Sequence, residues 1–251
     1  MINCVLMCGG RGSRLELNAG LKGSEDLIIE KPLLKLKQKP LIQYAINVLE
    51  TSTINLRIYA AISPNTKKTK EFIRKSYPNN VTILNTKGEG FSNDYKEVIR
   101  YFETIHSRSD QKRQQIQEPN SLEPNKILFL PIDVPLMSKY TLKKILSIKQ
   151  ETPCVSIVID KNIVTSHGFT PTPFTICINN HEYCYSGISL VDICQLLNKI
   201  NWTFIAEKFE EKAVIINDPK LAFNINTNEE LHLVEEYLNN CYSDKKIRTD
   251  D

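Results

Sequence analysis

The sequence predicts an α/β fold with a mostly parallel central sheet and helices on both faces. Two observations support this prediction. Between residues 3 and 105, short apolar segments with the length of strands alternate with longer segments that have the apolar period of helices. A glycine-rich turn also follows the first strand directly, at the edge of the sheet where α/β proteins bind ligands. The 251 residues, of which 41% are hydrophobic, are enough for the core of one such domain.

Each expected strand in the first half of the chain is separated from the next by a helix or a long connection. Strands connected in this way pair in parallel, because the connection must return to the starting edge of the sheet. The strands are expected at residues 3–7, 56–62, 81–85 and 126–131, and the helices at residues 41–49, 67–77 and 94–105.

The segment 106–125 is polar and has no apolar period. We expect it to be a mobile surface insertion without a catalytic role, within a single domain that spans residues 1–251. The pattern after this segment is weaker. It indicates strands at residues 153–159, 175–178 and 213–216, and helices at residues 189–200 and 228–240.

Charge and composition exclude some classes of function. Lysine and arginine total 32 against 29 acidic residues, and a net charge of +3 is too small to predict nucleic acid as the main partner. The N-terminus lacks the layout of a signal peptide, and no apolar run approaches the roughly 18 residues that span a bilayer. We expect a cytoplasmic protein with no membrane segment. Its seven cysteines include no CxxC pair, so we expect them to be reduced.

The loop after the first strand has the composition of a phosphate-binding loop. Glycines let the backbone turn tightly enough to direct several N–H groups at one anion, and the arginines add positive charge. The loop is neither a Walker A motif nor a dinucleotide fingerprint, because it lacks GxxxxGK(S/T) and a third glycine in the required place. A cysteine in this loop is interpreted as a small side chain in a tight turn rather than a nucleophile, since no histidine is nearby in the sequence. The loop residues are Met7, Cys8, Gly9, Gly10, Arg11, Gly12, Ser13 and Arg14.

A second basic element, EKPLLKLKQKPLI at residues 30–42, follows the loop sequence GGRGSRL. Together they resemble the GGxG(S/T)RL and (E/D)KPL motifs of nucleotidyltransferases, which transfer NMP from an NTP to a phosphorylated acceptor and release pyrophosphate. The resemblance implies the Rossmann-like fold of these enzymes, with Arg11, Arg14 and Lys31 on the phosphates. The insert at residues 16–29 is longer than in the shortest members of the family.

Two further segments resemble metal-binding positions of the same enzymes. Asp133 directly follows the expected strand 126–131 and is similar to the aspartate of a GDxPL pattern, which holds Mg²⁺. Magnesium prefers oxygen ligands from one or two protein groups together with substrate phosphates. A turn-forming aspartate before proline is the alternative. In FNINT, the resemblance favours Asn224 as a ligand of the metal or the ribose, with Asn226 capping the following helix. Thr227 or Asn228 is also a candidate cap for that helix, and a purely structural role for both Asn224 and Asn226 remains open.

The loops at later strand ends resemble a narrower group, the archaeal adenosylcobinamide-phosphate guanylyltransferases, which are related to the molybdenum cofactor guanylyltransferases. The likeness lies in SPNTKKTKEFI, TKGEGFSNDYKEVI, YSGISLVD and FNINTNEEL. It implies transfer of GMP from GTP to adenosylcobinamide phosphate, with Mg²⁺ and without a covalent nucleophile. Arg11, Lys31 and Asp133 would be catalytic. Besides the glycine loop and Lys31, the nucleotide-binding residues would be Ser63, Asn65, Thr86, Gly88, Gly90, Gly187 and Asn224.

The sequence leaves other functions open. The same loops would serve a molybdopterin guanylyltransferase or a sugar-phosphate or cytidylyl transferase, because phosphate recognition does not report on the base or the acceptor. A nucleotide-sensing subunit without turnover is a third reading, and Asp133 speaks against it because simple binding needs no metal ligand. The glycines at 88 and 90 also fit ordinary turns. A homodimer is compatible with the sequence.

Overall fold

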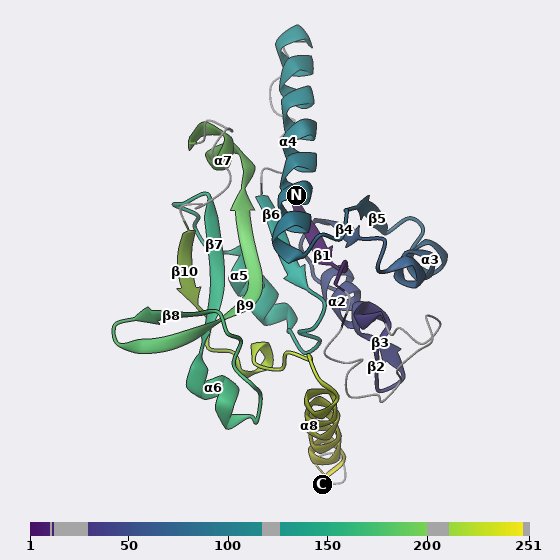
Figure 1. Ribbon diagram of the computed structural model, residues 1–251, viewed down its shortest axis with the longest axis vertical. Helices are drawn as coiled ribbons and strands as arrows, with labels where there is room; N and C mark the ends of the chain where they lie inside the picture. The colour runs from purple at the N-terminus through teal and green to yellow at the C-terminus, as the bar shows by residue number, and fades with distance from the viewer. Residues whose placement is uncertain (11, 13–29, 117–125, 200–210, 248–251) are drawn as a thin grey trace.

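The computed structural model describes residues 1–10, 12, 30–116, 126–199 and 211–247 (Figure 1). One large sheet crosses the molecule, and β9 runs antiparallel to all the strands that it contacts. The remaining pairs are parallel. In sheet order the strands are β10 (Glu211–Ile215), β7 (Cys154–Asp160), β9 (His181–Asp192), β6 (Lys126–Pro131), β1 (Ile2–Met7), β4 (Leu56–Ile62) and β5 (Val81–Asn85), with β8 (Thr175–Ile178) paired to β9 alone.

Helices cover both faces of this sheet, which confirms the predicted α/β architecture. Side chains alternate along a strand, so Val5 and Met7 of β1 face one layer while Cys4 and Leu6 face the other. The first layer contains α4 (Phe91–Ile116) and α7 (Ile193–Lys199). The second contains α2 (Leu41–Glu50), α3 (Lys67–Ser76), α5 (Lys139–Leu146), α6 (Lys161–Ser166) and α8 (Asn228–Ile247).

Short elements link the sheet to these helices. A 3-10 turn, η2 (Lys31–Leu33), precedes a two-stranded hairpin of β2 (Lys35–Leu36) and β3 (Lys39–Pro40), and a second turn, η4 (Pro219–Leu221), precedes α8. No helix in the described part of the chain is both long enough and apolar enough to cross a membrane.

Helix α4 differs from the prediction at both ends. It starts at Phe91 and continues to Ile116, so the expectation of an irregular insertion is wrong for residues 106–116, while residues 117–125 lie outside the described part. The apolar stripe of α4 packs on the sheet through Val98, Ile99 and Phe102. Beyond it the helix projects from the body of the molecule (Figure 1). Once a helix is nucleated, extension by good helix formers needs no further core contact.

The long strand β9 was not predicted. The expected helix 189–200 is wrong over residues 189–192, which form the end of β9, and α7 begins only at Ile193. Asp192 marks the boundary, because its Oδ1 accepts a hydrogen bond from the Gln195 backbone N–H at 3.0 Å, as an N-cap does. Gly187 explains part of the error, since its φ of +78° lies in a strand irregularity that interrupts the apolar alternation.

Candidate active site

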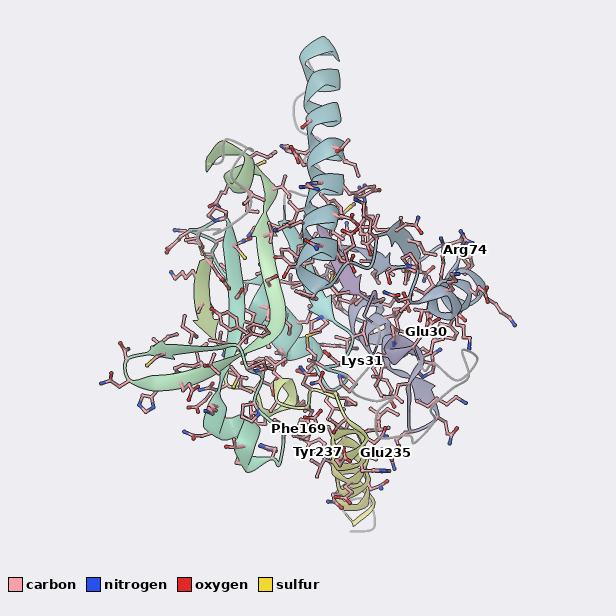
Figure 2. All side chains as sticks on the ribbon, viewed as in Figure 1. Glu30, Lys31, Arg74, Phe169, Glu235 and Tyr237 are labelled. Carbon is pink, nitrogen blue, oxygen red and sulfur yellow. The ribbon has the colours of Figure 1, made fainter. Side chains whose placement is uncertain are left out.

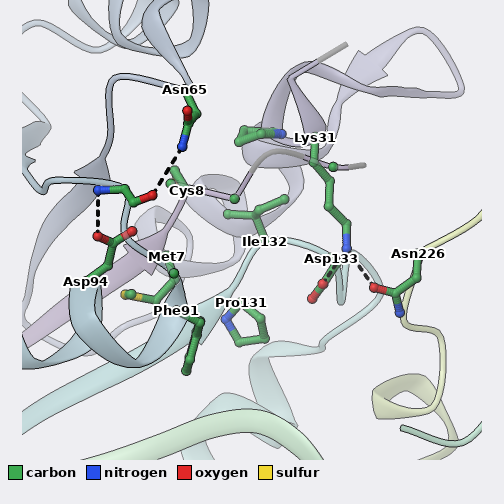
Figure 3. Close-up of a pocket in the computed structure, with 16 residues that line it drawn as sticks. Met7, Cys8, Lys31, Asn65, Phe91, Asp94, Pro131, Ile132, Asp133 and Asn226 are labelled. Atoms are coloured by element: carbon green, nitrogen blue, oxygen red, sulfur yellow. Dashed lines mark hydrogen bonds and ion pairs between the residues drawn. The ribbon is translucent and has the colours of Figure 1, made fainter. Parts of the chain in front are cut away.

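A cavity of about 500 Å³ lies beyond the carboxyl ends of β1, β4, β5 and β6 (Figure 3). The chain adds β4 and β5 on one side of β1 and then returns to place β6 on the other side. In open α/β sheets, ligands bind at the carboxyl edge where the strand order reverses in this way. The fold therefore places the expected phosphate loop at its natural binding edge.

Most predicted site residues that the structure describes line this cavity. Those lining it are Met7, Cys8, Gly9, Gly10, Gly12, Lys31, Asn65, Gly88, Gly90 and Asp133. Four others lie outside the lining, namely Ser63, Thr86, Gly187 and Asn224. Arg11, Ser13 and Arg14 fall outside the described residues.

Ser63 and Thr86 support the loops rather than face the cavity. The Ser63 hydroxyl donates to the Gly9 carbonyl at 2.8 Å and so ties the loop after β4 to the loop after β1. Thr86 is buried, and its backbone N–H and hydroxyl both donate to the Ile62 carbonyl, at 2.8 and 3.4 Å. Gly187 packs behind Pro131, a residue of the cavity lining, because a Cβ at Gly187 would lie 3.2 Å from Pro131 Cγ.

One end of the cavity is built by close backbone packing. A Cβ at Gly9 would lie 2.7 Å from Asp94 Oδ2. Gly88 has a φ of +74°, and a Cβ there would lie 2.8 Å from Asn65 Nδ2. Gly88 therefore requires glycine, because its φ is positive and a Cβ there would also lie 2.9 Å from Ser63 Cβ, whereas a side chain at Gly9 would force the Asp94 carboxylate to shift.

Asp94 is a cavity residue that the sequence analysis missed. It lies in the first turn of α4, is only 4% exposed, and accepts a hydrogen bond from the Gly88 N–H at 2.9 Å. Asn65 Nδ2 reaches the Gly88 carbonyl at 3.5 Å, so an amide and a carboxylate meet at this end of the cavity (Figure 3). An acidic residue in a first helical turn is common for electrostatic reasons alone, so the sequence offers no signal that distinguishes Asp94.

Lys31 and Asp133 form an ion pair at the opposite end. Lys31 Nζ lies 2.6 Å from Asp133 Oδ2 and donates a second hydrogen bond to Asn226 Oδ1 at 3.0 Å (Figure 3). The two charged side chains are 14% and 18% exposed. Asn226 Nδ2 in turn donates to Asn224 Oδ1 at 3.0 Å, which places Asn224 behind Asn226. Residues from three distant parts of the sequence thus converge on one ammonium group.

Glu30 fixes the backbone on the N-terminal side of Lys31. Its buried carboxylate accepts hydrogen bonds from the Lys68 N–H at 2.7 Å, from the Thr69 N–H at 2.6 Å and from the Thr69 hydroxyl at 2.5 Å. Helix α3 has no capping hydrogen bond from its own N-cap side chain, Thr66. Glu30 therefore satisfies N–H groups that the helix start leaves open, and its charge suits the helix dipole. Figure 2 shows Glu30 beside Lys31 and near α3.

Asn226 is fixed by the start of α8. Thr227 and Glu230 form a capping box: the Thr227 hydroxyl accepts from the Glu230 N–H at 3.2 Å, and Glu230 Oε2 accepts from the Thr227 N–H at 3.1 Å. The same Glu230 oxygen accepts from the Asn226 N–H at 2.6 Å. The expectation that Asn226 caps this helix is therefore wrong, because the cap is Thr227, the other candidate from the sequence. The Asn226 side chain instead lines the cavity and accepts a hydrogen bond from Lys31.

Two further contacts hold this segment against the rest of the site. The Ile225 N–H donates to the Asp133 carbonyl at 2.9 Å. Phe223 packs between Phe169 and Tyr237, with ring centroids 5.1 and 4.5 Å away. Figure 2 shows the latter two side chains near the start of α8. The segment is therefore positioned by a backbone bond on one side and an aromatic cluster on the other.

Asp133 retains an oxygen that fits a metal ion. Its Oδ1 atom is buried and has no hydrogen-bond partner among the described residues. A buried carboxylate oxygen without a partner is costly, so such an atom indicates a ligand. Asp133 Oδ1 and the amide oxygen of Asn226 are of the oxygen donor types that magnesium prefers, whereas Asn224 lies behind Asn226 and outside the cavity lining.

Cys8 is not suited to act as a nucleophile. It is 1% exposed, and burial raises the pKa of its thiol far above the ordinary value. A thiol rather than a thiolate is present at neutral pH, and thiols are poor nucleophiles. This agrees with its interpretation as a small side chain in the loop. All seven cysteines are free of disulfide bonds, as the sequence predicted.

Comparison with known proteins identifies one sequence relative. No family model matches the chain. Over 103 residues the chain is 38% identical to the adenosylcobinamide-phosphate guanylyltransferase of Methanocaldococcus jannaschii. The match covers 40% of this chain and spans 46% of the length of that relative.

Solved structures resemble the chain over nearly its whole length. HddC from Yersinia pseudotuberculosis, complexed with GMP-PN, superposes with a TM-score of 0.60 at 13% identity and covers 95% of this chain and 100% of HddC. CMP:2-keto-3-deoxy-manno-octonic acid synthetase, complexed with CTP, gives 0.58 at 12% identity and covers 96% and 98%. The 4-diphosphocytidyl-2C-methyl-D-erythritol synthase of Anaerococcus prevotii gives 0.55 at 10% identity and covers 95% and 98%. The chain therefore has the Rossmann-like fold of these proteins.

Proposed function

We propose that this chain, which has the Rossmann-like fold found in nucleotidyltransferases, is a guanylyltransferase that transfers GMP from GTP to adenosylcobinamide phosphate and releases pyrophosphate. The observation that carries the proposal is the convergence of Lys31 and Asp133 beside the glycine loop in one cavity. The sequence relative from Methanocaldococcus jannaschii supports the guanine nucleotide and the acceptor, because its name specifies both.

The cavity has two chemically different ends, as a nucleotide site requires. Asn65, Gly88 and Asp94 offer an amide, backbone groups and a carboxylate at one end, where a base would bind. Lys31 and Asp133 lie at the other end, where phosphates would bind. The nucleotide would thus lie across the carboxyl ends of β1 and β6, with its phosphates beside Gly9–Gly12.

Asp94 favours guanine among the bases. Guanine presents two adjacent N–H donor groups on its Watson–Crick edge, and an ionised carboxylate accepts several hydrogen bonds through its two oxygens. Asp94 uses one acceptor position for Gly88 and retains others. An Asp94→Asn exchange would replace acceptor capacity with a donor, and it should weaken GTP binding more than binding of other nucleotides.

The chemistry requires charge neutralisation and alignment rather than a covalent intermediate. An oxygen of the acceptor phosphate attacks the α-phosphorus of GTP, the bond to the β-phosphate oxygen breaks, and pyrophosphate leaves. Lys31 would place positive charge beside the transferred group, where a preorganised charge lowers the barrier. Asp133, with an amide oxygen of Asn224 or Asn226, would hold Mg²⁺, which supplies further charge neutralisation on the phosphates.

Three alternatives remain as outcomes of the test. A cytidylyltransferase is favoured by the superposition with the synthetase solved with CTP, which shares the fold. A different phosphorylated acceptor would leave the nucleotide site unchanged. A nucleotide sensor would bind GTP without turnover.

The experiment is a pyrophosphate-release assay with Mg²⁺ and each of GTP, ATP, CTP and UTP, with and without adenosylcobinamide phosphate. Release only with GTP and the acceptor together would support the proposal. Release with CTP would replace it by a cytidylyltransferase. Tight GTP binding without pyrophosphate release, with this acceptor and with others, would replace the proposal by a nucleotide sensor.

A further inference from the structure

The Lys31 ammonium binds one oxygen of the carboxylate that would hold the metal, and the other oxygen, Asp133 Oδ1, has no hydrogen-bond partner among the described residues. The ammonium lies 2.6 Å from Asp133 Oδ2 and 3.0 Å from Asn226 Oδ1, so a carboxylate oxygen and an amide oxygen both point at this cation. The same oxygen types are those that would coordinate Mg²⁺. In the structure, the oxygen cluster is therefore neutralised by a lysine of the chain itself.

Lys31 cannot bind Asp133 and the nucleotide phosphates with the same ammonium position. A lysine that neutralises a transferred phosphate must direct its ammonium at that phosphate, whereas here the ammonium donates hydrogen bonds to Asp133 and Asn226. A divalent ion on Asp133 would also lie close to the ammonium, and like charges at such separations repel strongly inside a protein. Binding of a divalent ion to Asp133 Oδ1 is therefore disfavoured as long as the ammonium stays on Oδ2.

We propose that Lys31 serves as an internal counterion of Asp133, so that a divalent metal binds this carboxylate only together with the nucleotide phosphates. This inference rests on the proposed function. Phosphate groups would attract the ammonium away from Asp133 and Asn226 and would provide the metal with additional oxygen ligands. Metal and nucleotide then bind cooperatively, because each favours the same rearrangement of Lys31.

The surrounding contacts restrict the movement to the side chain. Glu30, which directly precedes Lys31, is bound to α3 by three hydrogen bonds of its side chain, and Pro32, which directly follows Lys31, has a fixed φ. The backbone at Lys31 therefore stays in place. The flexible four-carbon stem of lysine allows its ammonium to move between acceptors, which the planar fork of arginine does less readily.

The test is binding of Mn²⁺ alone, followed by electron paramagnetic resonance, to the wild-type chain and to Lys31→Met. Without the internal cation, Asp133 should bind Mn²⁺ at least about tenfold more tightly, a change within the range of coupling between linked sites. Lys35→Met is the matched control, because Lys35 is exposed and lies outside the cavity lining. It should bind Mn²⁺ as the wild type does, and Lys31→Met/Asp133→Asn should lose the gain.

Equal Mn²⁺ affinity in wild type and Lys31→Met would overturn the proposal, because the metal would then bind Asp133 while the lysine stays in place. A similar gain in Lys35→Met would also overturn it, since the effect would come from net charge. Lys31→Gln provides a second neutral variant in case Lys31→Met unfolds, as judged by circular dichroism. The pyrophosphate assay is independent: a metal gain in Lys31→Met without any turnover by the wild type would refute the proposed function and leave the counterion role standing.

Discussion

Replacing Glu30 with alanine should lower both the free energy of unfolding and the kcat for pyrophosphate release. The buried carboxylate accepts three hydrogen bonds from Lys68 and Thr69 at the start of α3. Alanine would leave the two backbone N–H groups without their acceptor, and the Thr69 group is buried. Removal of a buried acceptor therefore affects both the helix start and the segment that carries Lys31.

The magnitude follows from these bonds. Loss of an N-terminal cap costs about 1 kcal/mol, and a hydrogen bond to a charged group contributes about 1.5–3 kcal/mol. Because the three bonds share one carboxylate, they do not add fully, and we expect a loss of about 2–4 kcal/mol. For a chain of this size that corresponds to a decrease in Tm of roughly 5–15 °C.

The assay is thermal or urea unfolding of Glu30→Ala, Glu30→Gln and the exposed control Glu71→Ala, combined with kcat for pyrophosphate release. Glutamine retains an acceptor oxygen without the charge, so it should lose about half as much stability. The kcat of Glu30→Ala should fall at least about tenfold at temperatures where the variant is folded, because small displacements of catalytic groups are costly. A Glu30→Ala variant as stable and active as Glu71→Ala would refute the capping role.

Three further predictions concern the cavity. Lys31→Ala should lower kcat at least about 100-fold, as removal of one preorganised charge does in other enzymes. Asp133→Asn should abolish Mg²⁺-dependent turnover without unfolding the protein. Full activity of either variant in steady-state assays would remove that residue from the mechanism. Glu230→Ala should release the Asn226 backbone and reduce kcat. The control is Glu229→Ala, which changes the charge at the same helix end without breaking the capping box and should reduce kcat less. Equal kcat values for the two variants would refute the positioning role of Glu230. Because burial raises the pKa of the Cys8 thiol, iodoacetamide at pH 8 should leave Cys8 unmodified in the folded protein, and turnover should persist. Peptide mapping checks this, and rapid labelling of Cys8 would contradict it.

The sequence predicted the first half of the fold well because local patterns determine it. Residues 2–7, 56–62 and 81–85 are short apolar runs with a helix between each pair, and each formed the expected strand. Strand β9 was missed because its residues are buried in one half and exposed in the other, so no single period describes them. Its place between β6 and β7 depends on pairing with distant strands, which no local signal encodes.

The site shows the same division between local and distant information. Motifs located Gly9, Lys31 and Asp133 individually, because each belongs to a contiguous pattern. The 2.6 Å contact between Lys31 and Asp133 joins residues 102 positions apart, and it depends on β1 lying beside β6. The sequence left the cap of the last helix open between Asn226, Thr227 and Asn228, and the structure shows that Thr227 is the cap and that Asn226 rather than Asn224 lines the cavity.

Two buried glutamates impose a common constraint on stability and activity. Glu30 caps α3 and precedes Lys31, while Glu230 caps α8 and holds the backbone of Asn226, the residue that accepts a hydrogen bond from Lys31. Each carboxylate satisfies N–H groups at a helix start, where the helix dipole also favours negative charge. Lys31 is thus linked to the start of α3 through the neighbouring Glu30 and to the start of α8 through Asn226, and in the described part of the chain its ion pair is with Asp133 rather than with either glutamate. Substitutions at either glutamate should therefore lower stability and turnover together.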